Sequence, residues 1–336
     1  IGYPYQGVAG LFPIRLANPD YGWELNKKFE ASVDLGILKD RLLFSFSYYR
    51  NRSDNQLVGY PLPPSTGFTV IQDNFSAVVQ NTGVEVELES INRKSGDFTW
   101  TSAFNLTVPR NRLIAYPNIE GSPYSSLYKE GETLLIQNKY HYIGVDTETG
   151  IYSFEDVNHD GNLSNPYDLQ FRKKVGQDYY GGLNNSLTYK RIQIDIFFQF
   201  VRQTGRNYMA GFVPPGIMRN QPKFVMNRWQ RPGDVADIQK FTSTISEAYD
   251  AYYTNSVFYG DNVIDDASFI RLKNISLSYQ LPQNWLQRIK SQSARVYIQA
   301  QNLLTFTNYS GMDPESQQTN SVPPLKVIVA GAQIAF

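Results

Sequence analysis

The chain of 336 residues contains no cysteine. It therefore has no disulfide scaffold, no thiol nucleophile and no cysteine-ligated zinc or iron–sulfur site. Neither sign of charge dominates, because 31 basic residues balance 31 acidic ones, so the composition does not favour nucleic-acid binding. Long apolar runs are also missing. No window holds about eighteen consecutive apolar residues, which argues against a membrane-spanning helix.

Aromatic residues are abundant in this chain. It has 24 Tyr and 20 Phe in a polar background with a mean hydropathy of −0.40. This combination suits a β-barrel that presents one face to lipid and the other to water. It suits a soluble sugar-binding β-protein equally well, so composition leaves both classes open.

Nine segments alternate apolar and polar residues with the period of a β-strand. They are residues 30–37, 41–50, 83–91, 98–108, 181–189, 192–201, 269–281, 294–306 and 325–336. The last one (LKVIVAGAQIAF) ends on Phe336 and is about as long as a tilted strand that crosses a bilayer. In the third, Glu85, Glu87 and Glu89 share a face, which is costly in a packed core and ordinary beside a watery lumen.

The connections between these segments alternate strictly in length. Residues 38–40, 92–97, 190–191 and 282–293 form short connections, whereas 51–78, 109–180, 202–268 and 307–324 form long ones. Outer-membrane barrels have short periplasmic turns and long external loops, so the pattern predicts this fold. It places Phe306 at the outer rim and Tyr189 and Tyr279 at the inner rim. Nine strands is an odd number, so we expect residues 1–336 to be the C-terminal part of one larger barrel domain.

Five segments resemble the C-terminal barrel of the SusC/RagA-type TonB-dependent transporters. They are NPDYGWE (18–24), NTGVEVEL (81–88), GGLNN (181–185), FIRLKNISLSYQLP (269–282) and RVYIQAQNLLTFTNYSGMDPE (295–315). The chain departs from the family at 323–326, where PPLK replaces the usual Tyr-Pro and Arg. The N-terminal extension, energy-coupling box, plug domain and earlier strands of the family are not among these residues.

The resemblance implies about nine strands of a 22-stranded transmembrane antiparallel β-barrel in the outer membrane of a Gram-negative bacterium. It further implies import of oligosaccharides, glycans or peptides with TonB and a SusD-like surface lipoprotein, in complexes that can pair into dimers. No nucleophile elbow, P-loop or zinc-type histidine pattern occurs, so we expect no enzymatic activity. From the residues alone, a passive porin, a surface adhesin or a soluble carbohydrate-binding β-domain stays open.

One long connection contains the residue spacing of a calcium loop. The candidate ligands are Asp156, Asn158, Asp160, Asn162 and Asp168, with Gly161 at the position of the sharp turn. Tyr167 stands at the twelfth position, where such loops carry an acidic residue, and Asp168 follows it. The loop therefore holds a structural Ca²⁺, or it is an Asx-rich turn held by its own hydrogen bonds. We expect no other cofactor.

Aromatic residues gather in the long connection 202–268. Trp229, Tyr249, Tyr252 and Tyr253 are the candidate substrate-binding residues, because aromatic rings stack on sugars and pack against protein partners. The alternative is that these rings form the small core that a long ordered loop needs.

Overall fold

The computed structural model describes residues 14–122, 124–288, 290–318 and 321–336. They divide into two compact units. The first contains the described residues up to Glu30, together with Tyr49–Thr82 and Asn111–Leu134. The second contains Ala31–Tyr48, Gly83–Arg110 and Leu135–Phe336. Within these described ranges, no helix has the length and apolar character needed to cross a bilayer.

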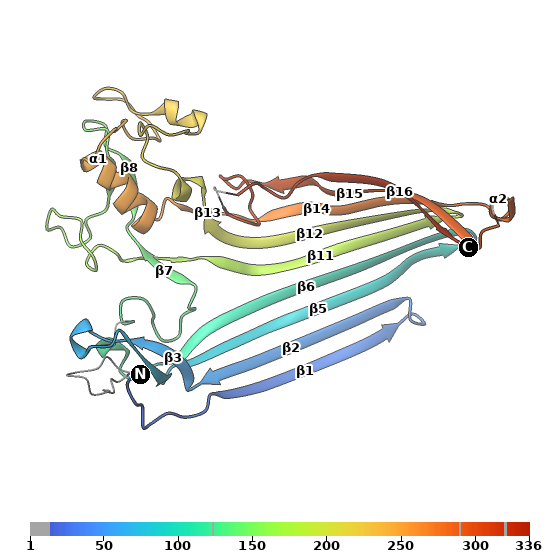
Figure 1. Ribbon diagram of the computed structural model, residues 1–336, viewed down its shortest axis with the longest axis horizontal. Helices are drawn as coiled ribbons and strands as arrows, with labels where there is room; N and C mark the ends of the chain where they lie inside the picture. The colour runs from blue at the N-terminus through green and yellow to red at the C-terminus, as the bar shows by residue number, and fades with distance from the viewer. Residues whose placement is uncertain (1–13, 123, 289, 319–320) are drawn as a thin grey trace, which may run out of the picture. The chain divides into compact units, whose positions relative to one another are not determined.

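The main sheet contains ten strands, nine of which follow one another in chain order. These are β1 (Leu25–Ile37), β2 (Leu42–Asp54), β5 (Val78–Ser95), β6 (Phe98–Ala115), β11 (Gly176–Tyr189), β12 (Ile192–Arg206), β14 (Phe269–Gln280), β15 (Ser293–Thr307) and β16 (Val327–Ala335). The short β13 (Ile264–Asp266) pairs with β12. Neighbours from β6 to β16 are antiparallel, and Figure 1 shows β11, β12, β14 and β15 side by side. The predicted antiparallel sheet with nine successive strands is confirmed.

The strands extend beyond the alternating pattern, mostly toward the long connections. β6 and β12 begin at Phe98 and Ile192 as predicted, but they end at Ala115 and Arg206, several residues later than the pattern does. The alternation exists because the two faces meet different solvents. Where both faces of a strand meet water, the alternation of apolar and polar residues is lost, but the hydrogen bonds between the strands continue. β5 also reaches Ser95, so the predicted turn 92–97 shortens to residues 96–97.

The two faces of the main sheet differ in polarity. Leu277 of β14 pairs with Ile194 of β12 and with Ile298 of β15 on one face. The adjacent pair, Ser276 and Gln299, lies on the other face. Leu277 and Ile298 are 46% and 47% exposed, and the other sheets in the described ranges have two strands each. An exposed apolar face on a single large sheet is typical of a membrane-spanning barrel wall and not of a soluble sandwich.

A bulge in β14 keeps the apolar face continuous. Phe197 of β12 pairs with Asn274, and the next residue, Phe198, pairs with Leu272, so Lys273 has no partner in this register. A shift of one residue turns later side chains to the opposite face of a strand. The extra residue therefore reconciles the odd spacing between Leu272 and Ile275, which both belong to the apolar face.

The connections contain secondary structure of their own. They hold β3 (Gln56–Pro61), η1 (Pro64–Thr66), β4 (Val70–Phe75), η2 (Ile119–Gly121), β7 (Ile136–Lys139), β8 (Tyr142–Val145), β9 (Tyr152–Phe154), β10 (Phe171–Lys174), η3 (Tyr208–Gly211), η4 (Lys223–Asn227), α1 (Glu247–Asp250), the π-helix η5 (Ala251–Tyr259) and α2 (Gln283–Arg288). β3 pairs with β4, β7 with β10, and β8 with β9. In the first unit, Ala77, Val79, Leu113 and Tyr116 form a small core.

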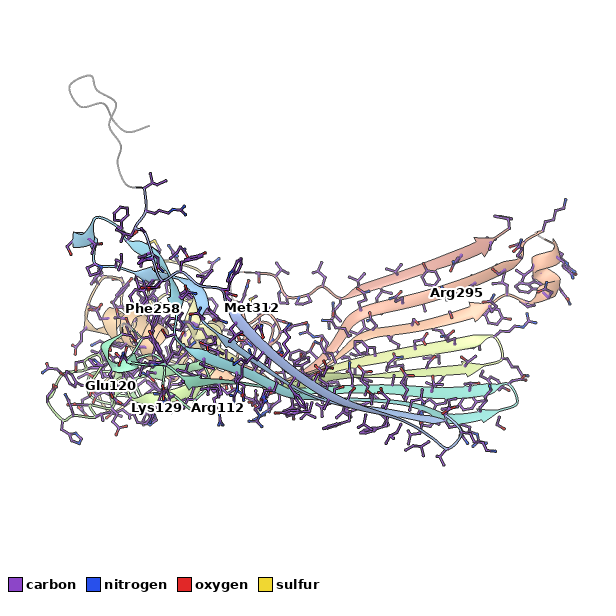
Figure 2. The ribbon with its side chains drawn as sticks, turned by 90° about the horizontal axis from the view of Figure 1, so that it is seen from below. Arg112, Glu120, Lys129, Phe258, Arg295 and Met312 are labelled. Carbon is purple, nitrogen blue, oxygen red and sulfur yellow. The ribbon has the colours of Figure 1, made fainter. Side chains whose placement is uncertain are left out.

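The long connections emerge from one end of the strands of the second unit. In Figure 1, α1 and β8 lie beyond that end of β11 and β12, and α2 lies at the other end. Figure 2 shows the same arrangement through two labelled side chains, Phe258 among the connections and Arg295 near the opposite end of the sheet. This agrees with the predicted alternation of long and short connections.

Candidate functional site

The helical segment α1–η5 in the long connection after β12 is built around a buried core. Ser246 begins it, because its hydroxyl accepts a hydrogen bond from the backbone N–H of Tyr249. One face of the segment contributes Ala248, Ala251, Tyr252 and Val257 to a cluster with residues of β9, η3 and the chain around Val263. The opposite face is exposed, so this segment presents side chains to the outside from a fixed backbone.

Two of the four candidate aromatic residues are core residues in this structure. Tyr252 is 4% exposed, and its ring stacks on Tyr152 with centroids 5.9 Å apart. Trp229 is 9% exposed, and its Nε1 donates to the carbonyl oxygen of Thr147 at 2.9 Å. Their rings are therefore occupied by packing in this conformation.

The other two candidates belong to an aromatic stripe, defined here as the half-buried Tyr249 and the exposed Tyr253, Phe258 and Tyr259. The ring centroids of Tyr249 and Tyr253 are 5.5 Å apart, those of Tyr253 and Phe258 5.2 Å, and those of Phe258 and Tyr259 6.5 Å. Phe258 is 52% exposed. Four adjacent rings on one ordered segment form a surface suited to the apolar face of a sugar or to a protein side chain.

The π-helical winding of η5 aligns the stripe. In an α-helix, residues five apart point in different directions, whereas the wider π turn places residues i and i+5 on nearly the same face. Tyr253 and Phe258 have this spacing, and their rings make an edge contact with an interplanar angle of 87°. The sequence pattern alone, read with the α-helical period, separates these two residues.

The C-terminal carbonyl groups of η5 are bound by two cations and a neighbouring strand. Arg206 donates from Nη2 to the carbonyl oxygen of Val257 at 2.7 Å, and Lys139 donates from Nζ to that of Phe258 at 3.0 Å. The backbone N–H of Tyr140 donates to the carbonyl oxygen of Tyr259 at 2.8 Å. The last turn of a helix leaves such acceptors unpaired, and positive charge is favourable there. These contacts hold Phe258 and Tyr259 in place.

The stability of this segment should depend on pH through Lys139. Burial, and then the nearby Arg206, lower the pKa of Lys139 to about 8 from its ordinary 10.5. Between these two values the unfolded chain binds more protons than the folded one, so stability rises with pH. We expect amide exchange in 251–259, corrected for intrinsic rate, to slow relative to other segments as pH rises from about 8 toward 10. Lys139→Met should remove this dependence, and a rise that persists in the variant contradicts it.

The predicted calcium loop is folded around two carboxylates. Asp168 is fully buried and accepts hydrogen bonds from the backbone N–H groups of Val157 and Ser164 at 2.8 and 2.7 Å. These bonds, that of Ser164 first, lower the pKa of Asp168. Asp156 Oδ2 accepts from the N–H of Gly161 at 2.8 Å, while Asp156 Oδ1 is buried without a hydrogen-bond partner. One oxygen of the first ligand position is thus available for a cation.

The remaining candidate ligands are partly occupied by one another. Asn158 donates to Asp160 Oδ2 at 2.9 Å, and Asp160 Oδ1 accepts from the N–H of Asn162 at 2.8 Å. The described residues contain no gathered set of three or more acidic, histidine or cysteine side chains suited to a metal. The loop geometry fits an Asx-rich turn, and Asp156 Oδ1 is its one buried side-chain oxygen without a hydrogen-bond partner.

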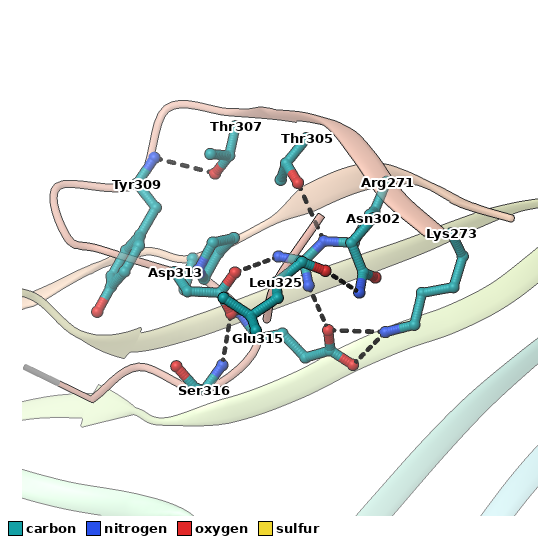
Figure 3. A network of polar contacts seen from close by, with 12 residues as sticks. Arg271, Lys273, Asn302, Thr305, Thr307, Tyr309, Asp313, Glu315, Ser316 and Leu325 are labelled. Atoms are coloured by element: carbon teal, nitrogen blue, oxygen red, sulfur yellow. Dashed lines mark hydrogen bonds and ion pairs between the residues drawn. The ribbon is translucent and has the colours of Figure 1, made fainter. Parts of the chain in front are cut away.

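The polar face of β14 carries a buried ion network (Figure 3). Arg271 is 2% exposed and pairs with Asp313 through Nη2 and with Glu315 through Nη1, the latter at 2.6 Å. Its Nε donates to Thr305 Oγ1 at 3.0 Å. Lys273 Nζ lies 2.9 Å from Glu315 Oε2. Lys273 is two residues from Arg271, on the same side of the strand, so both cations reach one carboxylate.

This network fixes residues 308–317, the first part of the connection after β15, against the wall. Asp313 Oδ1 accepts from the backbone N–H groups of Glu315 and Ser316, each at 3.0 Å. Gln203 of β12 donates from Nε2 to the carbonyl oxygen of Pro314 at 2.7 Å. Buried charges are costly without partners, so each ion here depends on the others. The segment therefore has one defined position on the polar face.

Comparison with known proteins identifies the family. The sequence model of the family described as TonB dependent receptor-like, beta-barrel, matches residues 2–303. The chain belongs to this family. The TonB-dependent receptor P3 of Formosa agariphila is 29% identical over 94% of this chain and 33% of its own length. The TonB-dependent receptor SusC of Bacteroides thetaiotaomicron is 24% identical over 95% of this chain and 32% of its own length.

A solved structure agrees with the family assignment. The structure of the RagAB peptide transporter is 25% identical, with a TM-score of 0.76, and the match covers 96% of this chain and 36% of that one. The chain thus spans about a third of the length of the relatives it matches. The predicted resemblance to SusC/RagA-type TonB-dependent transporters is confirmed.

The ion network explains two of the segments that carry this resemblance to TonB-dependent receptors. Arg271 and Lys273 belong to FIRLKNISLSYQLP, and Asp313 and Glu315 end RVYIQAQNLLTFTNYSGMDPE. Sequence reasoning did not single out these four residues. Arg271 and Asp313 are 42 positions apart, and the pattern shows no contact between them. The sequence feature that could have indicated the network is the pair Arg271 and Lys273, the two charged residues of a strand whose other residues are uncharged.

Proposed function

We propose that the chain is the C-terminal part of the barrel of an outer-membrane importer of Gram-negative bacteria. Family membership over residues 2–303 carries this proposal, and the two-faced main sheet supports it. The cargo is an oligosaccharide, glycan or peptide, taken up with TonB and a SusD-like surface lipoprotein, in complexes that can form dimers. RagAB, the solved relative, is a peptide transporter. The aromatic stripe is the part of this chain that contacts cargo or the lipoprotein.

Uptake by the full-length protein tests this proposal. We expect a deletion strain to lose growth on one class of glycan or peptide, and to regain it with the intact gene only when TonB is present. Uptake that does not need TonB would instead assign the barrel to the passive porins. Failure of the strain to lose growth on any such nutrient, with surface display intact, points to an adhesin.

Replacing the aromatic stripe should weaken uptake without preventing folding. We expect Tyr253→Ala combined with Phe258→Ala to raise the half-saturating cargo concentration or the Kd for the lipoprotein about tenfold. The loss of a central aromatic contact is on the order of 1–2 kcal/mol. Tyr167→Ala is the matched control, since Tyr167 is exposed on another loop and lies outside the stripe. Equal values for the double variant and the control would remove the stripe from the proposed role.

We also propose that the loop 156–168 binds Ca²⁺ with Asp156 Oδ1 as the central ligand. Asp160 and the amide and backbone oxygens around it complete the oxygen set that this hard cation prefers. We expect Tb³⁺ luminescence, sensitised by nearby tyrosines, from the intact protein and at least a tenfold weaker affinity in Asp156→Asn. Asp156→Asn keeps the size of the side chain and removes its charge. If luminescence is absent, or is the same in the variant, the loop 156–168 is an Asx-rich turn and not a Ca²⁺ site.

A further inference from the structure

A groove of about 490 Å³ lies where β11, β12, β14 and β15 approach the long connections. We call it the outer-rim groove and define it by Tyr179, Phe200, Arg202, Ser268, Ile270 and Phe306, which line it. Phe200 pairs with Ile270, and Ile270 pairs with Phe306, so three apolar side chains form a row across three strands. Ile270 and Phe306 are 50% and 59% exposed. This row belongs to the apolar face of the sheet.

Polarity changes abruptly at the upper edge of this row. Arg202 is two residues beyond Phe200, on the same face of β12, and it pairs in register with Tyr179 of β11. Two residues of a strand span about 7 Å. The same wall therefore passes from aromatic and aliphatic side chains to a guanidinium and a phenol within that distance. Such a boundary marks the level at which hydrocarbon meets lipid headgroups in a membrane-spanning barrel.

The groove is open because the ring of Phe200 lies flat against the wall. A Cβ atom at Gly181, the partner of Phe200 in register, would be 2.6 Å from Cζ of that ring and 2.1 Å from the carbonyl oxygen of Asn105. The ring of Phe200 is also stacked on Phe104, with centroids 5.8 Å apart and an interplanar angle of 14°. Glycine at 181 thus lets the aromatic ring settle onto the backbone and leaves space above Ile270.

The polar edge carries a neutral pair of exposed charges. Arg202 Nη1 lies 2.7 Å from Asp266 Oδ2, and both side chains are about half exposed. Asp266 Oδ1 accepts from the backbone N–H of Ser268 at 2.9 Å. A guanidinium has five N–H donors, and this pair uses one of them. Exposed ion pairs contribute little stability, so either partner can exchange its contact for a ligand at small cost.

We propose that the outer-rim groove binds a membrane lipid with a phosphoethanolamine headgroup. An acyl chain lies over Phe200, Ile270 and Phe306, the phosphate accepts from the unused N–H groups of Arg202, and the ammonium donates to Asp266. A neutral Arg–Asp pair complements a zwitterion better than an anion, because an anion gains from Arg202 and is repelled by Asp266. The site requires a membrane-spanning barrel but does not depend on what the barrel imports.

Native mass spectrometry of the full-length protein tests this site. The probes are phosphatidylethanolamine, phosphatidylcholine, phosphatidylglycerol and diacylglycerol with identical acyl chains. We expect phosphatidylethanolamine to be retained about tenfold more than each of the others, the size of one charge-assisted hydrogen bond. Phosphatidylcholine lacks the N–H donors for Asp266, phosphatidylglycerol lacks the ammonium, and diacylglycerol lacks the whole headgroup.

Two variants separate the headgroup contact from the apolar floor. Arg202→Gln combined with Asp266→Asn should reduce phosphatidylethanolamine most, lower phosphatidylcholine and phosphatidylglycerol toward the level of diacylglycerol, and leave diacylglycerol unchanged. Ile270→Trp, which fills the groove, should reduce all four. Equal retention of the four lipids by the wild type overturns the proposal, as does a headgroup preference that survives the double variant. A protein dimer that dissociates in Ile270→Trp would also overturn it, by assigning the groove to a contact between copies.

Discussion

Arg271→Met should release residues 308–317 from the wall of the barrel. Asp313 is buried in the wild type, and removal of the guanidinium leaves its carboxylate without a counter-ion. Removing one partner of a buried ion pair costs about 3–5 kcal/mol, far more than the loss of an exposed pair. We expect amide exchange of 308–317 to accelerate by about two to three and a half orders of magnitude, as that cost implies. The strand β14 itself should exchange as before, since its backbone ladder is unchanged.

The control is Lys174→Met, which breaks the pair between Lys174 and Asp178, whose side chains are 33% and 45% exposed. It should change local exchange by no more than about fivefold, as expected for roughly 0.2–1 kcal/mol. A double variant, Arg271→Met with Asp313→Asn, removes both members of the buried pair. Asparagine retains an oxygen that can accept from the N–H groups of Glu315 and Ser316. This variant should recover part of the protection. If residues 308–317 exchange in Arg271→Met as they do in the wild type, the other contacts, such as that of Gln203, are enough to hold this segment in place.

Ile298→Arg should destabilise the barrel in a bilayer. Ile298 lies in the interior of β15, between the apolar Leu277 and Ala330 of its neighbours, and is exposed on the face assigned to lipid. An arginine at the midplane of a transmembrane strand costs about 2–4 kcal/mol. We expect lower surface levels and a lower midpoint of urea unfolding in liposomes for the full-length protein.

Gln299→Arg is the matched control for this variant. Gln299 is the next residue of the same strand and pairs with Ser276 on the polar face. The same substitution there places the charge toward water, so we expect a change within about 0.5 kcal/mol. If the two variants behave alike, the assignment of faces to lipid and water is wrong.

The main sheet was largely predictable because a strand in a membrane barrel must alternate between residues that face lipid and residues that face water. Residues 192–196 and 294–301 alternate in the period of a strand, and the starts of β12 and β15 agree with the pattern to within one residue. The ends toward the long connections were not predictable from alternation, since both faces of the strand meet water there. The bulge at Lys273 was also not foreseen, because period-two counting has no means to place an extra residue.

The candidate site was predictable only in part. Composition indicated an aromatic group in 202–268, but it could not sort Tyr252, which packs in the core, from Tyr253, which is exposed. That distinction depends on the π-helical winding of η5 and on the core around Met209 and Val263. The partners of Arg271 and of Arg202 come from segments distant in sequence, and no local pattern encodes such contacts.

The order of side chains along each strand by itself determined that this protein has long strands with one apolar and one polar face, joined by alternating short and long connections. Only the tertiary structure decided which charges meet, which rings are exposed and that the pair of Arg202 and Asp266 lies beside an apolar groove. The physical reason is that the first property is local in sequence and the second is not. The preference of a strand residue for lipid or water is a property of that residue and its immediate neighbours. An ion pair or a groove instead requires residues of different strands to lie side by side in the folded sheet.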